Sequence, residues 1–346
     1  MTGGLAKNPE PAIDGLAFRP ATAADWEALA GVVNRARRAD GTDEVRTADD
    51  LASEHAHLDL ARDTLVAEVH GRIAGYGVGS VHERDGALVA ELGGAVDPAF
   101  RRRGVGTALF RRNLAALQAQ LADDRRPLPR EVRCYALDTE AADVALLAAE
   151  GFVPIRFGYE MRRPLTGILP ERALPPGLVM RPPTEDEYRR VFDADQEAFR
   201  DHWGHRAPLD EDFQRRFYGP DMDPGIFCVA WDGDEVAGVV TNAVFAGENE
   251  ALGIRRGWLE HVSVRRPWRG RGVAKALCAA SFRILRDLGM DEAWLGVDGS
   301  NPTGAVRLYE GLGFHVVRGW KAYGRPLDGP APAGWQSAGD RETMGA

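Results

Sequence analysis

The chain has 346 residues, of which 44% are hydrophobic and 27% are charged, a composition typical of folded globular proteins. Its net charge of −9 argues against a nucleic-acid-binding surface but is compatible with a local basic pocket for one anionic ligand. The three cysteines have no metal-motif or disulfide-framework spacing, and no run approaches the ~18 apolar residues of a membrane span. These features predict a cytoplasmic protein without a metal, a nucleic-acid partner or a membrane partner.

Hydrophobic periodicity and helix-capping residues predict the same order of elements twice. The first series has strands at 16–19, 64–69, 73–82, 88–96, 131–137 and 153–161, and helices at 23–37, 47–58, 104–121 and 141–150. The second has strands at 178–181, 227–232, 236–245, 258–264, 292–297 and 315–323, and helices at 185–200, 210–217, 272–288 and 303–312. Strands that alternate with helices around a central meander predict an α/β fold with a mixed sheet in each half.

Short motifs recur in the same order as these elements. The turn from Arg101 to Gly106 and the turn from Arg269 to Ala274 both read Arg-x-x-Gly-x-Gly/Ala, 168 residues apart, and a Gly-Phe pair recurs after 162 residues. A repeat of this length indicates duplication of a whole domain. We expect domains at 16–164 and 177–327, a proline-containing linker at 165–176, and flexible tails at 1–15 and 328–346. Residues 1–15 also lack the apolar core of a signal peptide.

Each glycine-rich turn follows a predicted strand and opens a predicted helix. Unpaired backbone N–H groups gather there at the positive end of the helix dipole, an arrangement that binds phosphates. Gly270 and Gly272 carry no Cβ that would keep the backbone away from phosphate oxygens. The sequence therefore predicts a phosphate-bearing ligand at this turn, with an alternative of a tight loop in another kind of strand–helix unit.

This order of elements resembles the GNAT superfamily of N-acetyltransferases. The resemblance is carried by the two Arg-x-x-Gly-x-Gly/Ala turns and by the segment from Asn301 to Phe314, and it covers almost the whole chain as two tandem domains. It implies acetyl-CoA as co-substrate, with its diphosphate on the turn and its pantetheine arm along a free strand edge around 261–264. The cofactor-binding residues expected in the second half are Val262, Val264, Arg269, Gly270, Arg271, Gly272, Val273, Ala274 and Asn301. Those expected in the first half are Val96, Arg101, Gly104, Val105 and Gly106.

The resemblance also suggests catalytic residues in the second half. Tyr309 is the expected general acid for the thiolate leaving group, and Glu260 is the expected general base. Strand alternation predicts that Glu260 shares a face with Val262 and Val264. His261 is a rival base, because its unperturbed pKa lies near neutrality, but alternation predicts that it faces the other side.

The first half lacks these groups. Counting from shared landmarks places Leu147 where the second half has Tyr309, and Leu92 where it has Glu260. Thr139 stands in the place of Asn301. We therefore expect the first copy to be catalytically silent.

Two functions remain open on the sequence. One is an acetyl-CoA-dependent N-acetyltransferase of a small-molecule primary amine that is active in its second domain and favoured as a monomer. The other is a non-catalytic acyl-CoA-binding sensor. Residues 202–206 (His-Trp-Gly-His-Arg) lie where family members bind the acceptor and could grip an anionic or aromatic substrate, or form a solvated loop.

Overall fold

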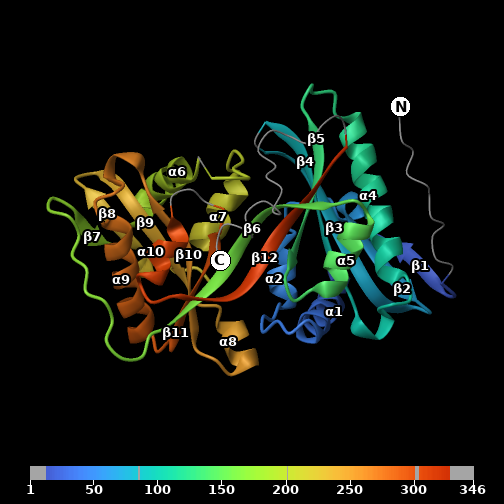
Figure 1. Cartoon of the computed structure of the whole chain (residues 1–346), viewed down its shortest axis with the longest axis horizontal. Helices are drawn as coiled ribbons and strands as arrows, with labels where there is room; N and C mark the ends of the chain where they lie inside the picture. Colours follow the sequence, from blue (N-terminus) through green and yellow to red (C-terminus); the bar gives the residue numbers. More distant parts are fainter. Residues whose placement is uncertain (1–12, 85, 201, 301–303, 328–346) are drawn as a thin grey trace, which may run out of the picture. The chain divides into compact units, whose positions relative to one another are not determined.

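The computed structural model describes residues 13–84, 86–200, 202–300 and 304–327. The chain forms two compact units. Unit 1 comprises the described residues up to Ile155 together with those from Ala322 onward, and unit 2 comprises those from Arg156 to Lys321. The fold of each unit is a mixed α/β sheet with helices on both faces (Figure 1).

In chain order, the first series of elements is β1 (Leu16–Arg19), α1 (Trp26–Ala39), α2 (Ala48–Glu54), α3 (Leu60–Asp63), β2 (Thr64–Val69), β3 (Arg72–Arg84), β4 (Ala87–Val96), α4 (Val105–Asp123), β5 (Arg130–Leu137), α5 (Ala141–Ala149) and β6 (Val153–Pro164). The predicted helix at 47–58 ends earlier, at Glu54, and the short α3 follows it. Thr47 caps α2 as expected, since its side chain accepts a hydrogen bond from the Asp50 N–H.

The second series is β7 (Val179–Arg181), α6 (Tyr188–Phe199), α7 (Asp210–Tyr218), β8 (Cys228–Asp232), β9 (Glu235–Ala243), α8 (Ala246–Leu252), β10 (Arg256–Val264), α9 (Val273–Asp287), β11 (Glu292–Asp298), α10 (Ala305–Glu310) and β12 (His315–Pro326). The predicted elements recur in this order, and α8 is an addition that the periodicity did not indicate.

The strand order follows the same plan in both units. It is β1-β2-β3-β4-β5 in unit 1 and β7-β8-β9-β10-β11 in unit 2, and in each series only the last pair is parallel. Helices α1 to α3 cover one face of the sheet in unit 1 and α4 and α5 the other, as α6 and α7 cover one face in unit 2 and α9 and α10 the other. In unit 1, Trp26 and Leu29 of α1 pack on Val66 and Tyr76, whereas Leu114 and other residues of α4 pack on the opposite face. Figure 1 shows α1 and α2 in blue and α4 and α5 in green tones on the sheet of unit 1.

The last strand of each repeat completes the sheet of the other unit. In β6, residues 158–164 pair antiparallel with the whole of β11, inside unit 2. The end of β12 belongs to unit 1, where Tyr323 joins the core and the Leu327 N–H donates to the Arg130 carbonyl at 2.9 Å. The predicted domain ranges 16–164 and 177–327 describe the two sequence repeats and stay a prediction. The compact units differ from these ranges because residues of β6 belong to unit 2 and the end of β12 belongs to unit 1.

Candidate active site in unit 2 and its counterpart in unit 1

The glycine turn of unit 2 joins β10 to α9. Gly270 and Gly272 have φ angles of +74° and +88°, a left-handed conformation that glycine adopts without a side-chain clash. A Cβ built on either glycine would meet no atom within 4 Å, so this backbone borders open space. Gly272 is the N-cap of α9, a helix of 15 residues. The turn therefore offers main-chain donors at the positive end of a helix dipole, an arrangement that fits a diphosphate.

The first arginine of each turn braces it against the first helix of its unit. In unit 2, Arg269 donates to the carbonyl oxygens of Val264 and Ala198, both at 2.9 Å. In unit 1, Arg101 donates to the equivalent carbonyls of Val96 (3.2 Å) and Ala36 (3.4 Å). The motif thus has a structural use in both repeats that the sequence did not indicate.

The other expected cofactor-binding residues differ in exposure. Arg271 is exposed and Ala274 is half-buried. Val105 and Val273 bury their side chains beneath α4 and α9, so only their main chains are available to a ligand. Asn301 lies outside the described residues.

The two parallel strands of unit 2 separate next to this turn. β10 pairs with β11 only over residues 256–258, although β10 continues along β9 to Val264 and β11 continues along β6 to Asp298. The separation leaves the end of β10 with one edge that its neighbour does not cover. Val262 and Val264 lie on this stretch and pack, half-buried, against the core that includes α9.

A β-bulge interrupts β10 at Glu260. Leu259 pairs with Asn242 and His261 pairs with Thr241, so Glu260 is an additional residue that the register with β9 skips. The Glu260 residue is exposed. The bulge thus places a solvent-accessible carboxylate at the point where β10 leaves β11.

The bulge also changes which side chains share a face. Leu259, Val262 and Val264 all pack against the α9 core, whereas His261 and Ser263 contact Asp195 of α6 on the other face. Strict alternation along β10 would place Leu259 on the face of His261, but the extra residue shifts the alternation and Leu259 shares the face of Val262 and Val264 instead.

The sheet register corrects the counterpart of Glu260 in unit 1. β4 pairs with β3 without interruption over all ten residues, with Gly93 opposite Val78 and Leu92 opposite Gly79. Val96 pairs with the neighbouring strand as Val264 does, and the count back from these two residues matches Gly93 with His261. One pair further back, Leu92 matches Leu259. Leu92 and Leu259 are both buried. The expected match of Leu92 with Glu260 is wrong, since unit 1 has one residue fewer.

His261 is held by two charged residues of α6 and α7. Its Nδ1 lies 2.9 Å from Oδ2 of Asp195, and its Nε2 lies 2.9 Å from a terminal nitrogen of Arg216, which also binds Asp195 at 2.9 Å. The Asp195 side chain is 1% exposed. Burial raises the pKa of Asp195, but the neighbouring His261 and Arg216 outweigh it and hold the pKa below its ordinary value. A carboxylate within the apolar stripe of α6 was the available sequence signal for this cluster.

Tyr309 projects from α10 into the core that contains α9, with its ring 5.9 Å from that of Phe314. Burial raises the pKa of Tyr309 well above its ordinary value, so its hydroxyl is protonated at neutral pH. The Phe314 N–H donates to the Tyr309 carbonyl at 3.0 Å, and the Phe152 N–H donates to the Leu147 carbonyl at the same distance. Leu147 therefore occupies the position of Tyr309 in unit 1, as the spacing predicted.

The loop after α6 is folded onto the same face as His261. The ring of Phe199 lies 4.4 Å from that of His202 and 4.8 Å from that of His261. The guanidinium of Arg156 lies 5.4 Å from the ring of Trp203 and forms an ion pair with Asp298. Burial lowers the pKa of His202, which favours its neutral form. Arg156 belongs to β6, so the exchanged strand contributes to this side of unit 2.

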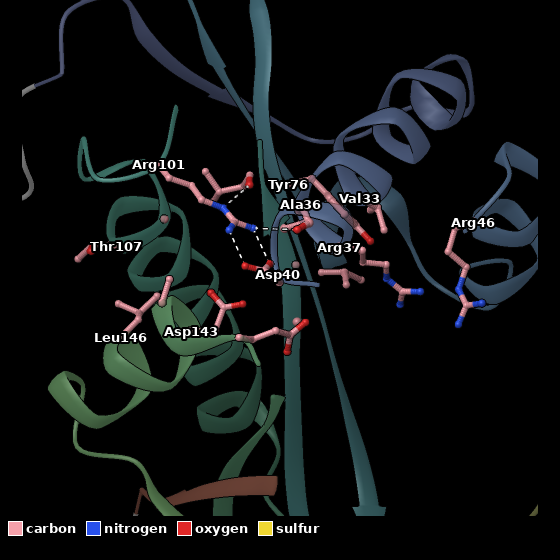
Figure 2. Close-up of a pocket in the computed structure, with 18 of the residues that line it drawn as sticks. Val33, Ala36, Arg37, Asp40, Arg46, Tyr76, Arg101, Thr107, Asp143 and Leu146 are labelled. Atoms are coloured by element: carbon pink, nitrogen blue, oxygen red, sulfur yellow. Dashed lines mark hydrogen bonds and ion pairs between the residues drawn. The ribbon is translucent and has the colours of Figure 1, made fainter. Parts of the chain in front are cut away.

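Unit 1 contains a cavity of about 380 Å³ between α1, α2, β3, β4 and the turn before α4. Val96, Arg101, Gly104 and Gly106 line it, as does Tyr76. Figure 2 shows the Arg101 guanidinium paired with the Asp40 carboxylate, and Asp143 of α5 beside them. Burial and the nearby Asp40 raise the pKa of Asp143.

The unit 1 cavity is lined by two acidic residues, Asp40 and Asp143, that have no acidic counterpart in the sequence of unit 2. Asp40 follows Ala36 by four residues, as His202 follows Ala198, so the two residues match in sequence count. Asp143 precedes Leu147 by four residues, as Ala305 precedes Tyr309. By these counts, two acidic residues of unit 1 match a histidine and an alanine of unit 2.

Within residues 13–84, 86–200, 202–300 and 304–327, no group of three or more histidine, cysteine or acidic residues is arranged to hold a metal ion. No helix in these ranges combines the length and the hydropathy needed to cross a membrane.

Comparison with known proteins gives the family. The model of the acetyltransferase (GNAT) family matches residues 26–126 and again 188–314. The mycothiol acetyltransferase of Salinispora tropica is 33% identical over 299 residues (84% of this chain and 89% of that protein). That of Thermobispora bispora is 32% identical over 296 residues (85% and 93%).

Two solved structures have a similar fold. A GCN5-related N-acetyltransferase from Sphaerobacter thermophilus has a TM-score of 0.73 at 25% identity and covers 94% of this chain and 99% of its own. A tandem GNAT protein from the clavulanic acid biosynthesis pathway has a TM-score of 0.65 at 20% identity, with 92% and 100% covered. The chain belongs to the GNAT family of acetyltransferases, and it is an N-acetyltransferase built from two domains of that family.

Proposed function

We propose that unit 2 transfers the acetyl group of acetyl-CoA directly to the primary amine of a small molecule. The observation that carries this proposal is the bulge of β10, which exposes Glu260 where the parallel strands separate. The open glycine turn follows on the same strand. A carboxylate, a strand edge and an anion-binding turn thus occur within 15 residues of one another in sequence.

The turn of unit 2 fits the diphosphate of acetyl-CoA. The main chain of residues 269–274 would bind it, with Gly270 and Gly272 allowing close approach. The uncovered edge of β10 beside Val262 and Val264 would pair with the amides of the pantetheine arm. No metal takes part in this scheme, and Asn301 is assigned to the same cofactor site.

Acetyl transfer requires a neutral amine, so the acceptor must first lose a proton from its ammonium group. Glu260 would accept that proton. The amine nitrogen would then form a bond to the thioester carbonyl carbon, and the carbon–sulfur bond would break. Tyr309 would donate its proton to the leaving thiolate and regain one from the nitrogen, so that one proton is released overall. The raised pKa of Tyr309 keeps this proton in place before the reaction.

Unit 1 would hold no second catalytic centre. Val96, Arg101, Gly104 and Gly106 line a cavity at the cofactor turn, and Val105 belongs to the same turn with only its main chain available. The unit nevertheless has Leu147 in the position of Tyr309 and no residue that corresponds to Glu260. We assign to it a structural or cofactor-binding role.

The acceptor that we favour is the desacetyl precursor of mycothiol or a similar amine. This choice rests on the mycothiol acetyltransferases, which are about one-third identical over most of the chain. We also propose that the protein acts as a cytoplasmic monomer without a nucleic-acid or membrane partner, as expected from its charge, its scattered cysteines, its apolar runs and its internal duplication.

The test is a panel of amines assayed by release of free thiol from acetyl-CoA, with the desacetyl precursor of mycothiol included. Turnover with a small-molecule amine supports the proposal, and preference for the mycothiol precursor supports the choice of acceptor. Tight binding of acetyl-CoA with no thiol release for any amine would instead indicate an acyl-CoA sensor.

A further inference from the structure

The bulge at Glu260 is surrounded by contacts that hold the residue after it. A bulge interrupts the hydrogen-bond ladder, so its geometry has to be stabilised by other groups. The His261 N–H donates to Thr241 Oγ1 at 3.1 Å, a side-chain contact within the sheet. The His261 ring is bound on both sides by Asp195 and Arg216. We call these four residues (Asp195, Thr241, His261 and Arg216) the bulge clasp.

The contacts of the clasp select one tautomer of a neutral His261 ring. An arginine can only donate hydrogen bonds, so Nε2 of His261 must accept from Arg216. The proton of a neutral ring then lies on Nδ1 and is donated to Asp195. With the lone pair of Nε2 directed at a guanidinium and the ring locked by a buried carboxylate, His261 is arranged to anchor the strand rather than to accept a proton from a substrate.

The first repeat provides an internal control. Its strand β4 has no bulge over residues 87–96. Asp195 precedes Ala198 by three residues, so its counterpart before Ala36 is Val33. In the sheet, Thr241 and His261 correspond to Val78 and Gly93. The repeat that lacks the bulge therefore lacks these three members of the clasp as well.

We propose that the bulge clasp positions Glu260, with His261 as a positioning residue that acts on catalysis only through the Glu260 carboxylate. This inference rests on the proposed function of Glu260 as the base. Truncation of His261 would let β10 relax toward the continuous register of β4, and the Glu260 side chain would lose its place beside the strand edge.

A double-mutant cycle tests the dependence on Glu260. His261→Ala should lower kcat for acetyl transfer about 10- to 100-fold and change KM for acetyl-CoA less than about threefold. His261→Gln keeps one donor and one acceptor and should retain most of the activity. In the Glu260→Gln background, His261→Ala should cause no further loss, because both changes remove the same contribution.

The outcomes separate the two proposals. If Glu260→Gln has full activity, the assignment of the base fails and this inference fails with it. If Glu260→Gln is impaired but His261→Ala is not, only the clasp is overturned. Multiplicative losses in the double variant, or equal losses in His261→Gln and His261→Ala, would make His261 an independent proton acceptor and overturn the positioning role.

Hydrogen exchange gives a readout that does not depend on activity. In wild type, the amide of His261 should be protected by Thr241 Oγ1, and Thr241→Val should speed exchange in the peptide that covers 258–264 while other peptides of unit 2 are unchanged. The matched variant Val78→Thr in unit 1 should leave exchange in residues 87–96 unchanged. Unaltered exchange in Thr241→Val would contradict the clasp, and faster exchange throughout unit 2 would indicate general destabilisation and contradict it as well.

Discussion

The two units build the same glycine turn but differ in the strand that leads into it. Arg101 and Arg269 brace the two turns through equivalent carbonyls, and Gly104 and Gly272 cap the following helices with nearly equal φ angles of +89° and +88°. β4, however, keeps a continuous ladder, whereas β10 carries the extra residue Glu260. The glycine turn is therefore preserved in both copies of the duplicated domain, while one extra residue distinguishes the strands that lead into it.

The comparison is sharpened most by removing the proposed base. Glu260→Gln should lower kcat about 10²- to 10³-fold, since a general base contributes in this range. The control is Glu91→Gln in unit 1, whose carboxylate forms an ion pair with Arg84. The control should change thiol release less than about twofold, and full activity in Glu260→Gln would refute the assignment.

The proposed acid should have the next largest effect. Tyr309→Phe should lower kcat about 10- to 100-fold and alter KM for acetyl-CoA much less, because the lost interaction belongs to the transition state. Tyr76→Phe is the matched change, since Tyr76 lines the unit 1 cavity and burial raises its pKa to about 12. Steady-state kinetics of this control should give the wild-type kcat and KM. Equal turnover in Tyr309→Phe would exclude it from the mechanism.

The carboxylates of unit 1 allow a test in both directions. Asp143→Asn should strengthen binding of acetyl-CoA to unit 1 by about 3- to 10-fold at neutral pH, because a negative charge beside a diphosphate is repulsive. Since the pKa of Asp143 is raised, the wild-type carboxyl becomes neutral at a higher pH than a free aspartate, and the difference should shrink as the pH falls. Ala305→Asp should weaken binding to unit 2. Calorimetric titration with acetyl-CoA checks both variants. Affinities equal to those of wild type would contradict an electrostatic difference between the two units.

Asp195 should affect stability modestly. Its folded-state pKa is lowered, so its contribution is present above the unfolded value of about 3.9 and is lost as the pH falls through the folded-state value below it. Asp195→Asn should therefore lower the free energy of unfolding by roughly 1–3 kcal/mol at neutral pH, with the two proteins converging in acid. Denaturant unfolding at several pH values measures this difference in the free energy of unfolding. A difference that stays constant down to acid pH would contradict a lowered pKa of Asp195 in the folded state.

The turns, the order of elements and the loss of Tyr309 in the first copy were predictable because they depend on local patterns. Glycine spacing, helix periodicity and the count from Phe152 back to Leu147 are all read within a few residues. The bulge was not predictable in this way, since an extra residue is recognised only against the partner strand. The same reason explains the wrong match of Leu92 with Glu260.

The clasp and the exchanged strands depend on contacts between distant segments. Asp195 and His261 are 66 residues apart, and only the fold brings them together. Asp195 gave a partial signal, as a charge on the buried side of α6. Whether β6 pairs within its own repeat or with β11 depends on which sheet edge is open to it, and the sequence of the strand itself does not contain that information.

The most direct test of a catalytic unit 2 is a matched pair of turn variants, Gly272→Glu and Gly104→Glu, assayed by thiol release and by calorimetric titration with acetyl-CoA. Both place a carboxylate on an equivalent left-handed N-cap, so the backbone strain is comparable. Gly272→Glu should abolish turnover and the binding that supports it, and Gly104→Glu should leave turnover within about threefold of wild type. Loss of turnover in Gly104→Glu, with activity retained in Gly272→Glu, would contradict the account.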